Sequence, residues 1–173
     1  MKRQYFLLFT CLFSLLLSAS RCKKSHFDLP PETTTGANTF GCKVNGKVFA
    51  PRDGRGRPGL FCQYVYLGEG EGEGWFLNIP ATDWKGRESV RIYTDSLLLE
   101  EGLSYSLGQG KGRGDGNYEN SKIYKISASD SGQLIITKHD VSQRILSGRF
   151  WFDATNDAGE KVEIREGRFD ILY

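Results

Sequence analysis

Covalent chemistry in this sequence falls mainly to its four cysteines, at positions 11, 22, 42 and 62. Cys22 comes after a basic start, Lys2–Arg3, and an apolar run from Phe6 to Leu17. Such a run is typical of a secretory signal, since a membrane-spanning helix needs about 20 residues. We therefore predict a lipoprotein signal peptide over residues 1–21 and an acylated Cys22 that anchors the protein to a membrane.

The residue before Cys22 leaves a second interpretation open. Lipid-attachment signals usually place a small residue there, whereas this chain has Arg21. Ordinary signal cleavage after Ala19 or Ser20 would instead release a soluble protein. In the lipidated case we expect a cell-envelope protein at the outer membrane. The lack of an acidic run after Cys22 favours the periplasmic side, although the sequence does not fix the leaflet.

Cys42 and Cys62 remain as a pair once Cys22 carries lipid. The envelope beyond the inner membrane permits disulfides, so this pair is the disulfide candidate. Closing a loop of that length would contribute about 3 kcal/mol through the unfolded state. The alternative is two buried free thiols in neighbouring strands. A catalytic cysteine is disfavoured, because neither residue is near one of the two histidines in the sequence.

Other constellations that could perform catalysis are missing. His139 and Asp140 are adjacent on a predicted strand, so their side chains point to opposite faces and are poorly placed to cooperate. Two histidines do not suffice for a usual zinc site. The glycine-rich stretch 108–114 lacks the following helix that a phosphate-binding loop requires. We therefore predict no catalytic residue, no metal and no cofactor.

Exposed aromatic side chains are the remaining binding candidates. On a predicted strand over residues 60–67, tyrosines share one face, and Phe61, Val65 and Leu67 share the other. Exposed rings can stack on sugars or receive a partner protein. The alternative is that both faces of these strands are partly covered. The candidate ligand surface comprises Tyr64, Tyr66, Tyr93 and Trp151.

The charge of the chain argues against a nucleic-acid partner. The whole sequence has 23 basic and 21 acidic residues, but removal of residues 1–21 takes away three basic residues and no acidic one. The mature net charge is then −1, whereas nucleic-acid-binding domains usually carry a strong basic excess. The expected partners are the membrane, through the lipid, and an envelope protein or glycan.

Strands must position these residues, because apolar side chains recur with period two, most clearly in residues 145–154 and 161–173. Asn45–Gly46 between two apolar segments is a strong hairpin signal. No long helix is indicated. We predict an all-β fold, an antiparallel β-sandwich or small β-barrel of about ten short strands, as a single domain over residues 39–173. Residues 22–38, rich in proline and threonine, predict a flexible tether.

Cys22–Lys23–Lys24, LPPET at 29–33 and GANTFGCKVNGK at 36–47 form the most specific pattern in the chain. IITKHD at 135–140, SGRF at 147–150 and EGRFD at 166–170 are more general strand patterns. Together these segments resemble a group of small, largely uncharacterised lipoproteins of Bacteroidota. The resemblance implies a β-rich envelope lipoprotein and supplies no catalytic residues.

These patterns favour a non-enzymatic binding or scaffold module of the cell envelope. One alternative is an envelope hydrolase that acts on glycans, since β-sandwich folds host such enzymes, although fold alone is a weak warrant. Another is a subunit of a surface assembly that exchanges strands.

Overall fold

The computed structural model describes residues 28–68, 70 and 72–173. Within these residues the chain forms strands and turns and no helix, so the prediction of an all-β fold is confirmed. The strands are β1 (Thr39–Val44), β2 (Lys47–Phe49), β3 (Gln63–Leu67), β4 (Gly74–Asp83), β5 (Glu88–Asp95), β6 (Ser104–Leu107), β7 (Arg113–Glu119), β8 (Ile123–Lys125), β9 (Gly132–Asp140), β10 (Ile145–Thr155) and β11 (Lys161–Leu172).

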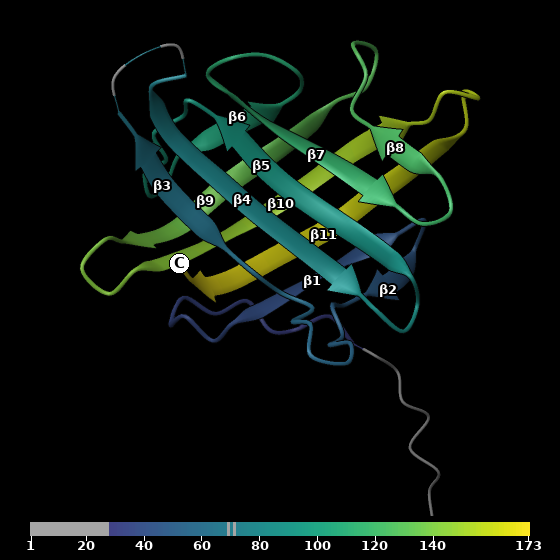
Figure 1. Cartoon of the computed structure of the whole chain (residues 1–173), viewed down its shortest axis with the longest axis horizontal. Coiled ribbons are helices and arrows are strands. Elements are labelled where there is room, and N and C mark those ends of the chain that lie inside the picture. Colours follow the sequence, from purple (N-terminus) through teal and green to yellow (C-terminus); the bar gives the residue numbers. More distant parts are fainter. Residues whose placement is uncertain (1–27, 69, 71) are drawn as a thin grey trace, which may run out of the picture.

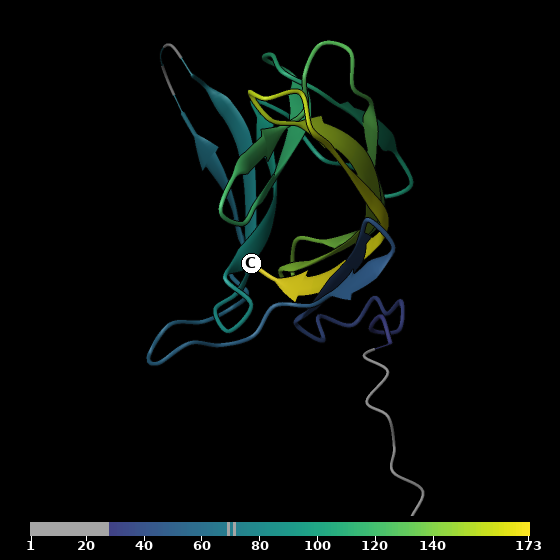
Figure 2. The same ribbon diagram turned by 90° about the vertical axis from the view of Figure 1, so that its right-hand side faces the viewer.

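All eleven strands belong to one sheet, in the order β2–β1–β11–β10–β9–β6–β7–β5–β4–β3. Neighbours are antiparallel except β6 and β7, which are parallel. In Figure 1 strands β4 and β5 cross in front of β9, β10 and β11. Figure 2 shows the cause: the sheet curls over, so that its two halves face each other. β8 pairs with both β7 and β10 and joins the two halves at one end.

The core lies between the two halves because alternation turns every second side chain inward. In β10 the predicted apolar face, at even positions from 146 to 154, is buried throughout. In β5 the inward residues Val90, Ile92 and Thr94 are buried. The predicted Asn45–Gly46 hairpin joins β1 and β2, and both residues have the positive φ values that a tight hairpin turn needs.

A bulge lets β11 keep apolar side chains inward along its whole length. Its buried apolar residues switch from even positions, 162 and 164, to odd positions, 169 and 171, which a regular strand cannot place on one face. The pairing with β10 shifts at this point, and Glu166 has a φ of 52°. Gly167 is required beside it, since a Cβ there would lie 2.5 Å from the ring of Phe150.

The segment before β1 is held on the outer side of the sheet by Asp170 of β11. This carboxylate is almost fully buried, and hydrogen bonds reach it from the segment and from β10. The donors are Thr33 Oγ1 (2.6 Å), Thr35 N (3.0 Å), Thr35 Oγ1 (3.5 Å), Gly36 N (2.8 Å), Ala37 N (3.1 Å) and Ser147 Oγ (2.7 Å). Residues 33–37 therefore belong to the folded domain.

The predicted flexible tether over residues 22–38 is thus wrong for its C-terminal part. The threonine- and glycine-rich composition suggested mobility, but composition does not reveal an acceptor 133 residues further along the chain. The structure also places Pro30 against β1, where a Cβ on Gly41 would lie 2.5 Å from the proline ring. Residues 22–27, including Cys22, and the predicted signal peptide lie outside the described residues.

The pKa of Asp170 reflects this arrangement. Burial alone would raise the pKa, but the hydrogen bonds from Thr33, Ala37 and Ser147 outweigh it and lower the pKa well below its usual range. An unfolded aspartate has a pKa of about 3.9. The carboxylate therefore stabilises the fold above about pH 4, and this contribution is lost as the pH falls below that value.

Replacing the carboxylate tests this contribution. Asp170→Asn should lower the free energy of unfolding by about 3 kcal/mol at pH 7, because the amide loses charge-assisted bonds and turns N–H groups toward donors. Urea unfolding measures the change, and the acid-side loss of stability should become shallower in the variant. Asp157→Asn, in an exposed turn, is the matched control and should change stability by less than about 0.5 kcal/mol. Similar values for both variants would contradict the assigned role.

Candidate functional site

The two ends of the curled sheet meet where the chain leaves β2. After Phe49 the chain crosses to β4 and pairs with its last residues, with Arg52 and Asp83 as bridge partners. The Arg52 N–H donates to the Thr82 carbonyl (3.1 Å), and the Trp84 N–H donates to the Arg52 carbonyl (3.1 Å). We call this junction the seam. It brings residues about 30 positions apart in the sequence into contact.

An ion pair closes the seam. Arg52 Nε donates to Asp83 Oδ1 (2.7 Å), and Nη2 donates to Oδ2, so the pair is bidentate. Asp83 is buried, whereas the side chain of Arg52 is partly exposed. The bonds from Arg52, and then those from the backbone of Gly86 and Lys85, lower the pKa of Asp83 despite its burial. Asp83 is therefore ionised, and both of its carboxylate oxygens accept hydrogen bonds within the protein.

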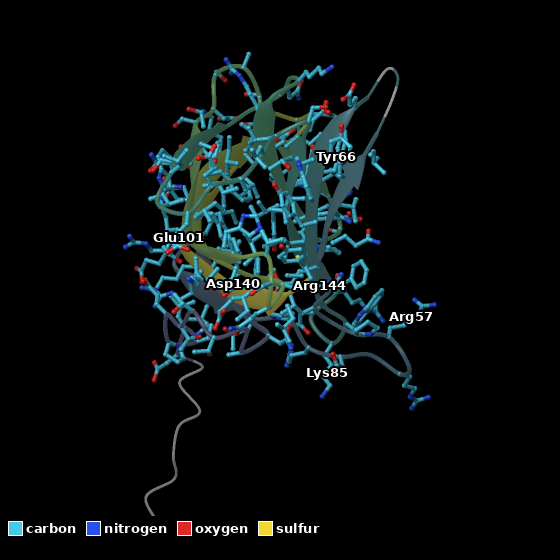
Figure 3. All side chains as sticks on the ribbon, turned by 90° about the vertical axis from the view of Figure 1, so that its left-hand side faces the viewer. Arg57, Tyr66, Lys85, Glu101, Asp140 and Arg144 are labelled. Atoms are coloured by element: carbon cyan, nitrogen blue, oxygen red, sulfur yellow. The ribbon has the colours of Figure 1, made fainter. Side chains whose placement is uncertain are left out.

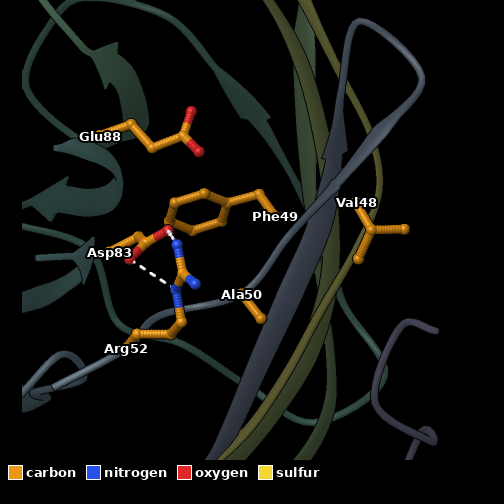
Figure 4. Close-up of a pocket in the computed structure, with 6 residues that line it drawn as sticks. All are labelled: Val48, Phe49, Ala50, Arg52, Asp83 and Glu88. Atoms are coloured by element: carbon orange, nitrogen blue, oxygen red, sulfur yellow. Dashed lines mark hydrogen bonds and ion pairs between the residues drawn. The ribbon is translucent and has the colours of Figure 1, made fainter. Parts of the chain in front are cut away.

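A pocket of about 240 Å³ lies at the seam. Its lining residues come from β2, from the crossing chain and from β4 and β5: Val48, Phe49, Ala50, Arg52, Asp83 and Glu88. In the view of Figure 4 the ring of Phe49 lies between the Arg52–Asp83 pair and the carboxylate of Glu88. The pocket thus combines an aromatic surface with charged groups, a combination typical of small-ligand sites.

Glu88 is the acidic residue of this pocket that forms no ion pair within the described residues. Its Oε2 accepts a hydrogen bond from the Tyr118 hydroxyl (2.8 Å). Within residues 28–68, 70 and 72–173, Glu88 has no basic side chain within 4 Å. Because Arg52 is paired with Asp83, the pocket lining has one more carboxylate than it has basic groups. Such a site attracts a cation.

None of these pocket residues is predicted as a site residue from the sequence. The sequence does contain one indication of Asp83. Leu77, Ile79 and Ala81 point inward from β4, and Asp83 follows at the next position on the same face of the strand. A charged residue in phase with apolar ones indicates a buried, paired carboxylate. The identity of its partner depends on the closure of the sheet, which local patterning does not contain.

The predicted Cys42–Cys62 disulfide is wrong, since both residues are free thiols. Cys42 lies in the core, and burial, together with the charge of Glu88, raises its pKa far above the ordinary value. Burial also raises the pKa of Cys62, to about 12. Both are therefore protonated at neutral pH, and neither is a nucleophilic thiolate. This is close to the alternative of two buried thiols.

The four aromatic candidates do not form one surface. Tyr64 is buried, stacks on Trp75 with ring centroids 4.9 Å apart and accepts a hydrogen bond from the Leu99 N–H, so its placement on a ligand surface is wrong. The other three retain some exposure but lie on different strands, each with its own partner. These are Tyr66 with Glu73, Tyr93 with Asp115 and Arg91, and Trp151 with Arg165.

The outward face of β3 is instead the one with Phe61, Val65 and Leu67, which are 40–53% exposed. The predicted alternation along this strand is present, but Tyr64, a candidate for an exposed surface, lies on the face that turns toward the core. Tyrosine is common at exposed binding sites, and this favoured the even-numbered positions. In the structure Tyr64 points inward, and Tyr66 lies beyond the edge of the core.

His139 and Asp140 have separate partners, as expected for neighbours on a strand. His139 Nδ1 is 2.8 Å from the Leu99 carbonyl oxygen, and Nε2 is 3.0 Å from the Tyr173 hydroxyl. Asp140 Oδ1 accepts hydrogen bonds from Ser142 Oγ and the Gln143 N–H. The two side chains therefore do not form an acid–base pair.

Comparison with known protein families gives one result. Residues 72–171 match the family described as Domain of unknown function (DUF6252). The chain belongs to this family. No curated protein and no solved structure matches the chain. The DUF6252 match runs from the turn before β4 into β11, so it contains Asp83, Glu88 and Tyr118, whereas Phe49 and Arg52 precede it.

Two further findings concern the described part of this DUF6252 protein. It holds no cluster of three or more histidine, cysteine, aspartate or glutamate side chains arranged to bind a metal ion. Among residues 28–68, 70 and 72–173, no helix is long and apolar enough to cross a membrane.

The seam ion pair of this DUF6252 protein can be tested by a double-mutant cycle. Asp83→Asn should lower the free energy of unfolding by about 2 kcal/mol, because a buried charged acceptor loses its pairing with Arg52 and two backbone donors. Arg52→Met should then add little in the Asp83→Asn background. Urea unfolding of the four proteins gives the coupling. Asp95→Asn, at the exposed end of β5, is the control and should leave stability nearly unchanged. If the changes in the free energy of unfolding caused by Arg52→Met and Asp83→Asn simply add, the two residues do not form a stabilising pair.

Proposed function

We propose that this protein is a lipid-anchored, non-enzymatic binding module of the cell envelope and that its ligand occupies the seam pocket. The observation that carries the proposal is the Glu88 carboxylate, which faces the pocket without a basic partner in the described part of the chain. A carboxylate without an ion-pair partner attracts a cationic group. A ligand that carries a positive charge would supply the missing partner.

The chemistry of the lining favours an organic amine of modest size. An ammonium group can pair with Glu88 and also lie against the face of Phe49, where the ring attracts a cation. A pocket of about 240 Å³ suits a single sugar ring or a similarly small group. An amino sugar combines this size with the required charge, and it agrees with the glycan partner expected from the sequence.

The lowered pKa of Asp83 supports non-enzymatic binding over glycan hydrolysis. A glycan hydrolase needs a carboxylic acid with a raised pKa as its proton donor. Asp83 has the opposite property, because its bonds to Arg52 lower the pKa. Cys42, near the same pocket, is a protonated thiol because its pKa is raised.

The lipid anchor would keep the pocket close to the membrane. Pro30 lies against β1 and residues 33–37 are bound to Asp170, so only the chain between Cys22 and Pro30 would separate the lipid from the folded domain. Eight residues in extended form span at most about 26–29 Å. This reach is shorter than a tether over residues 22–38 would give.

Calorimetry with two sugars tests the ligand class. Protein extracted from membranes should bind glucosamine saturably at about pH 6, where its amine is charged, and should bind N-acetylglucosamine at least about tenfold more weakly. Glu88→Gln should remove this preference without lowering the urea midpoint. Glu100→Gln, at an exposed position, is the matched control and should bind like the parent protein. Equal binding of both sugars, or an unchanged preference in Glu88→Gln, would overturn the assignment.

Intact-mass analysis tests the anchor separately. Protein extracted from its native membranes should begin at Cys22 and carry the added mass of acyl chains. Cys22→Ser should lose this mass and leave the membrane fraction. An unmodified N-terminus near Ser20 or Arg21 would show ordinary signal cleavage and refute the anchor, while leaving the pocket to be judged by calorimetry alone.

A further inference from the structure

Strand β3 ends the sheet, and one of its edges is free of other strands in the described part of the chain. Among these residues it pairs only with β4, in the register Gln63–Asn78 to Leu67–Gly74. The Phe61 N–H donates to the Pro80 carbonyl (3.3 Å), one step earlier in the same register. Hydrogen-bonded pairs recur at every second residue of an antiparallel ladder. Residues 61, 63, 65 and 67 therefore bond toward β4, while Tyr64 and Tyr66 direct their backbone N–H and C=O groups to the free edge.

The composition of this edge favours pairing. Residues 61–67 contain no charged residue and no proline, the two devices that usually protect an edge strand from other chains. Phe61, Val65 and Leu67 expose 40–53% of their surface on the outer side. Phe76, opposite Val65 on β4, is half-buried and extends the apolar patch. A free, apolar and uncharged edge is a template for another strand.

The charges at the two ends of β3 indicate which strand it accepts. Before β3, residues 51–59 contain three arginines and one aspartate. After β3, the only charged residues between positions 68 and 74 are glutamates, and the last of them, Glu73, accepts a hydrogen bond from the Tyr66 hydroxyl. Figure 3 shows Tyr66 and Arg57 toward opposite ends of this side of the molecule. An antiparallel second copy would bring the acidic end of one β3 beside the basic end of the other.

We propose that two copies of this protein associate by antiparallel pairing of their β3 strands about a two-fold axis at Val65. Tyr64 of one copy then exchanges backbone hydrogen bonds with Tyr66 of the other, and the two sheets become continuous. The interface is isologous, because the same edge serves both copies. It does not involve the seam pocket, so this inference and the proposed ligand can fail independently.

The axis makes a sharp prediction for cysteine cross-linking. Val65 faces its own copy in a non-hydrogen-bonded pair, where Cα atoms are about 4.5 Å apart, within the range of a disulfide. Two Leu67 residues would be separated by about 13 Å along the strands, which is too far. Val65→Cys in the full-length protein in membranes should form a reducible covalent dimer at least about tenfold faster than Leu67→Cys or the parent protein.

A charge at the axis supplies a second measurement. Val65→Lys places two like charges opposite each other and should convert the detergent-extracted dimer to monomer in light scattering. Val141→Lys, at an exposed position in the turn after β9, is the control and should remain dimeric. A monomeric parent protein, equal cross-linking of Val65→Cys and Leu67→Cys, or a mixed disulfide with a different protein would each overturn the pairing of two copies.

Discussion

The carboxylate of Asp170 is the acceptor on which the outer side of the sheet depends. It receives hydrogen bonds from the segment before β1 and from Ser147 of β10, and it thereby joins the beginning of the domain to its last strand. Among side chains, only a carboxylate offers two acceptor oxygens with enough lone pairs for this many donors. A buried carboxylate is costly by itself, but here each oxygen is bonded and the charge is favoured. The segment is ordered because Asp170 replaces the water that its backbone would otherwise need.

The other defining constraint is how the sheet closes. Its two ends do not pair along their length; the chain after β2 meets β4 only at the last residues of that strand. The remainder of the same edge of β4 is occupied by residues 60–67. One edge of β4 is thus divided between the crossing chain, which forms the pocket, and β3, which stays uncovered. The ligand site and the free edge are both consequences of this partial closure.

Local patterning predicted the parts of the fold that local physics determines. The apolar face of β10 and the Asn45–Gly46 hairpin follow from alternation and turn chemistry, and both are present. The class of fold was predictable for the same reason. The pocket was not, because Phe49, Arg52 and Glu88 are distant in sequence and meet only after the sheet has curled.

The errors have a common physical cause. Tyr64 and Val65 alternate as predicted, but which of the two faces solvent depends on the side of β3 that the rest of the sheet covers. Composition predicted a flexible tether because the acceptor that orders this segment, Asp170, lies far away on the last strand. The disulfide rested on compartment and cysteine count, neither of which fixes the geometry of Cys42 and Cys62. Each missing fact is a long-range contact.

The free edge of β3 lacks the charges and prolines that usually protect an edge strand from other chains. A lysine in place of Val65 would protect the edge at little cost, since this position is exposed and contributes little to the core. The chain instead keeps β3 uncharged and places arginines before it and glutamates after it. An antiparallel pair of β3 strands places the arginines before one strand beside the glutamates after the other, so opposite charges at the two ends favour this pairing. A hydrophobic contact without a fixed orientation would gain nothing from such a charge pattern. In the proposed dimer this distribution of charge would set the orientation of the two β3 strands.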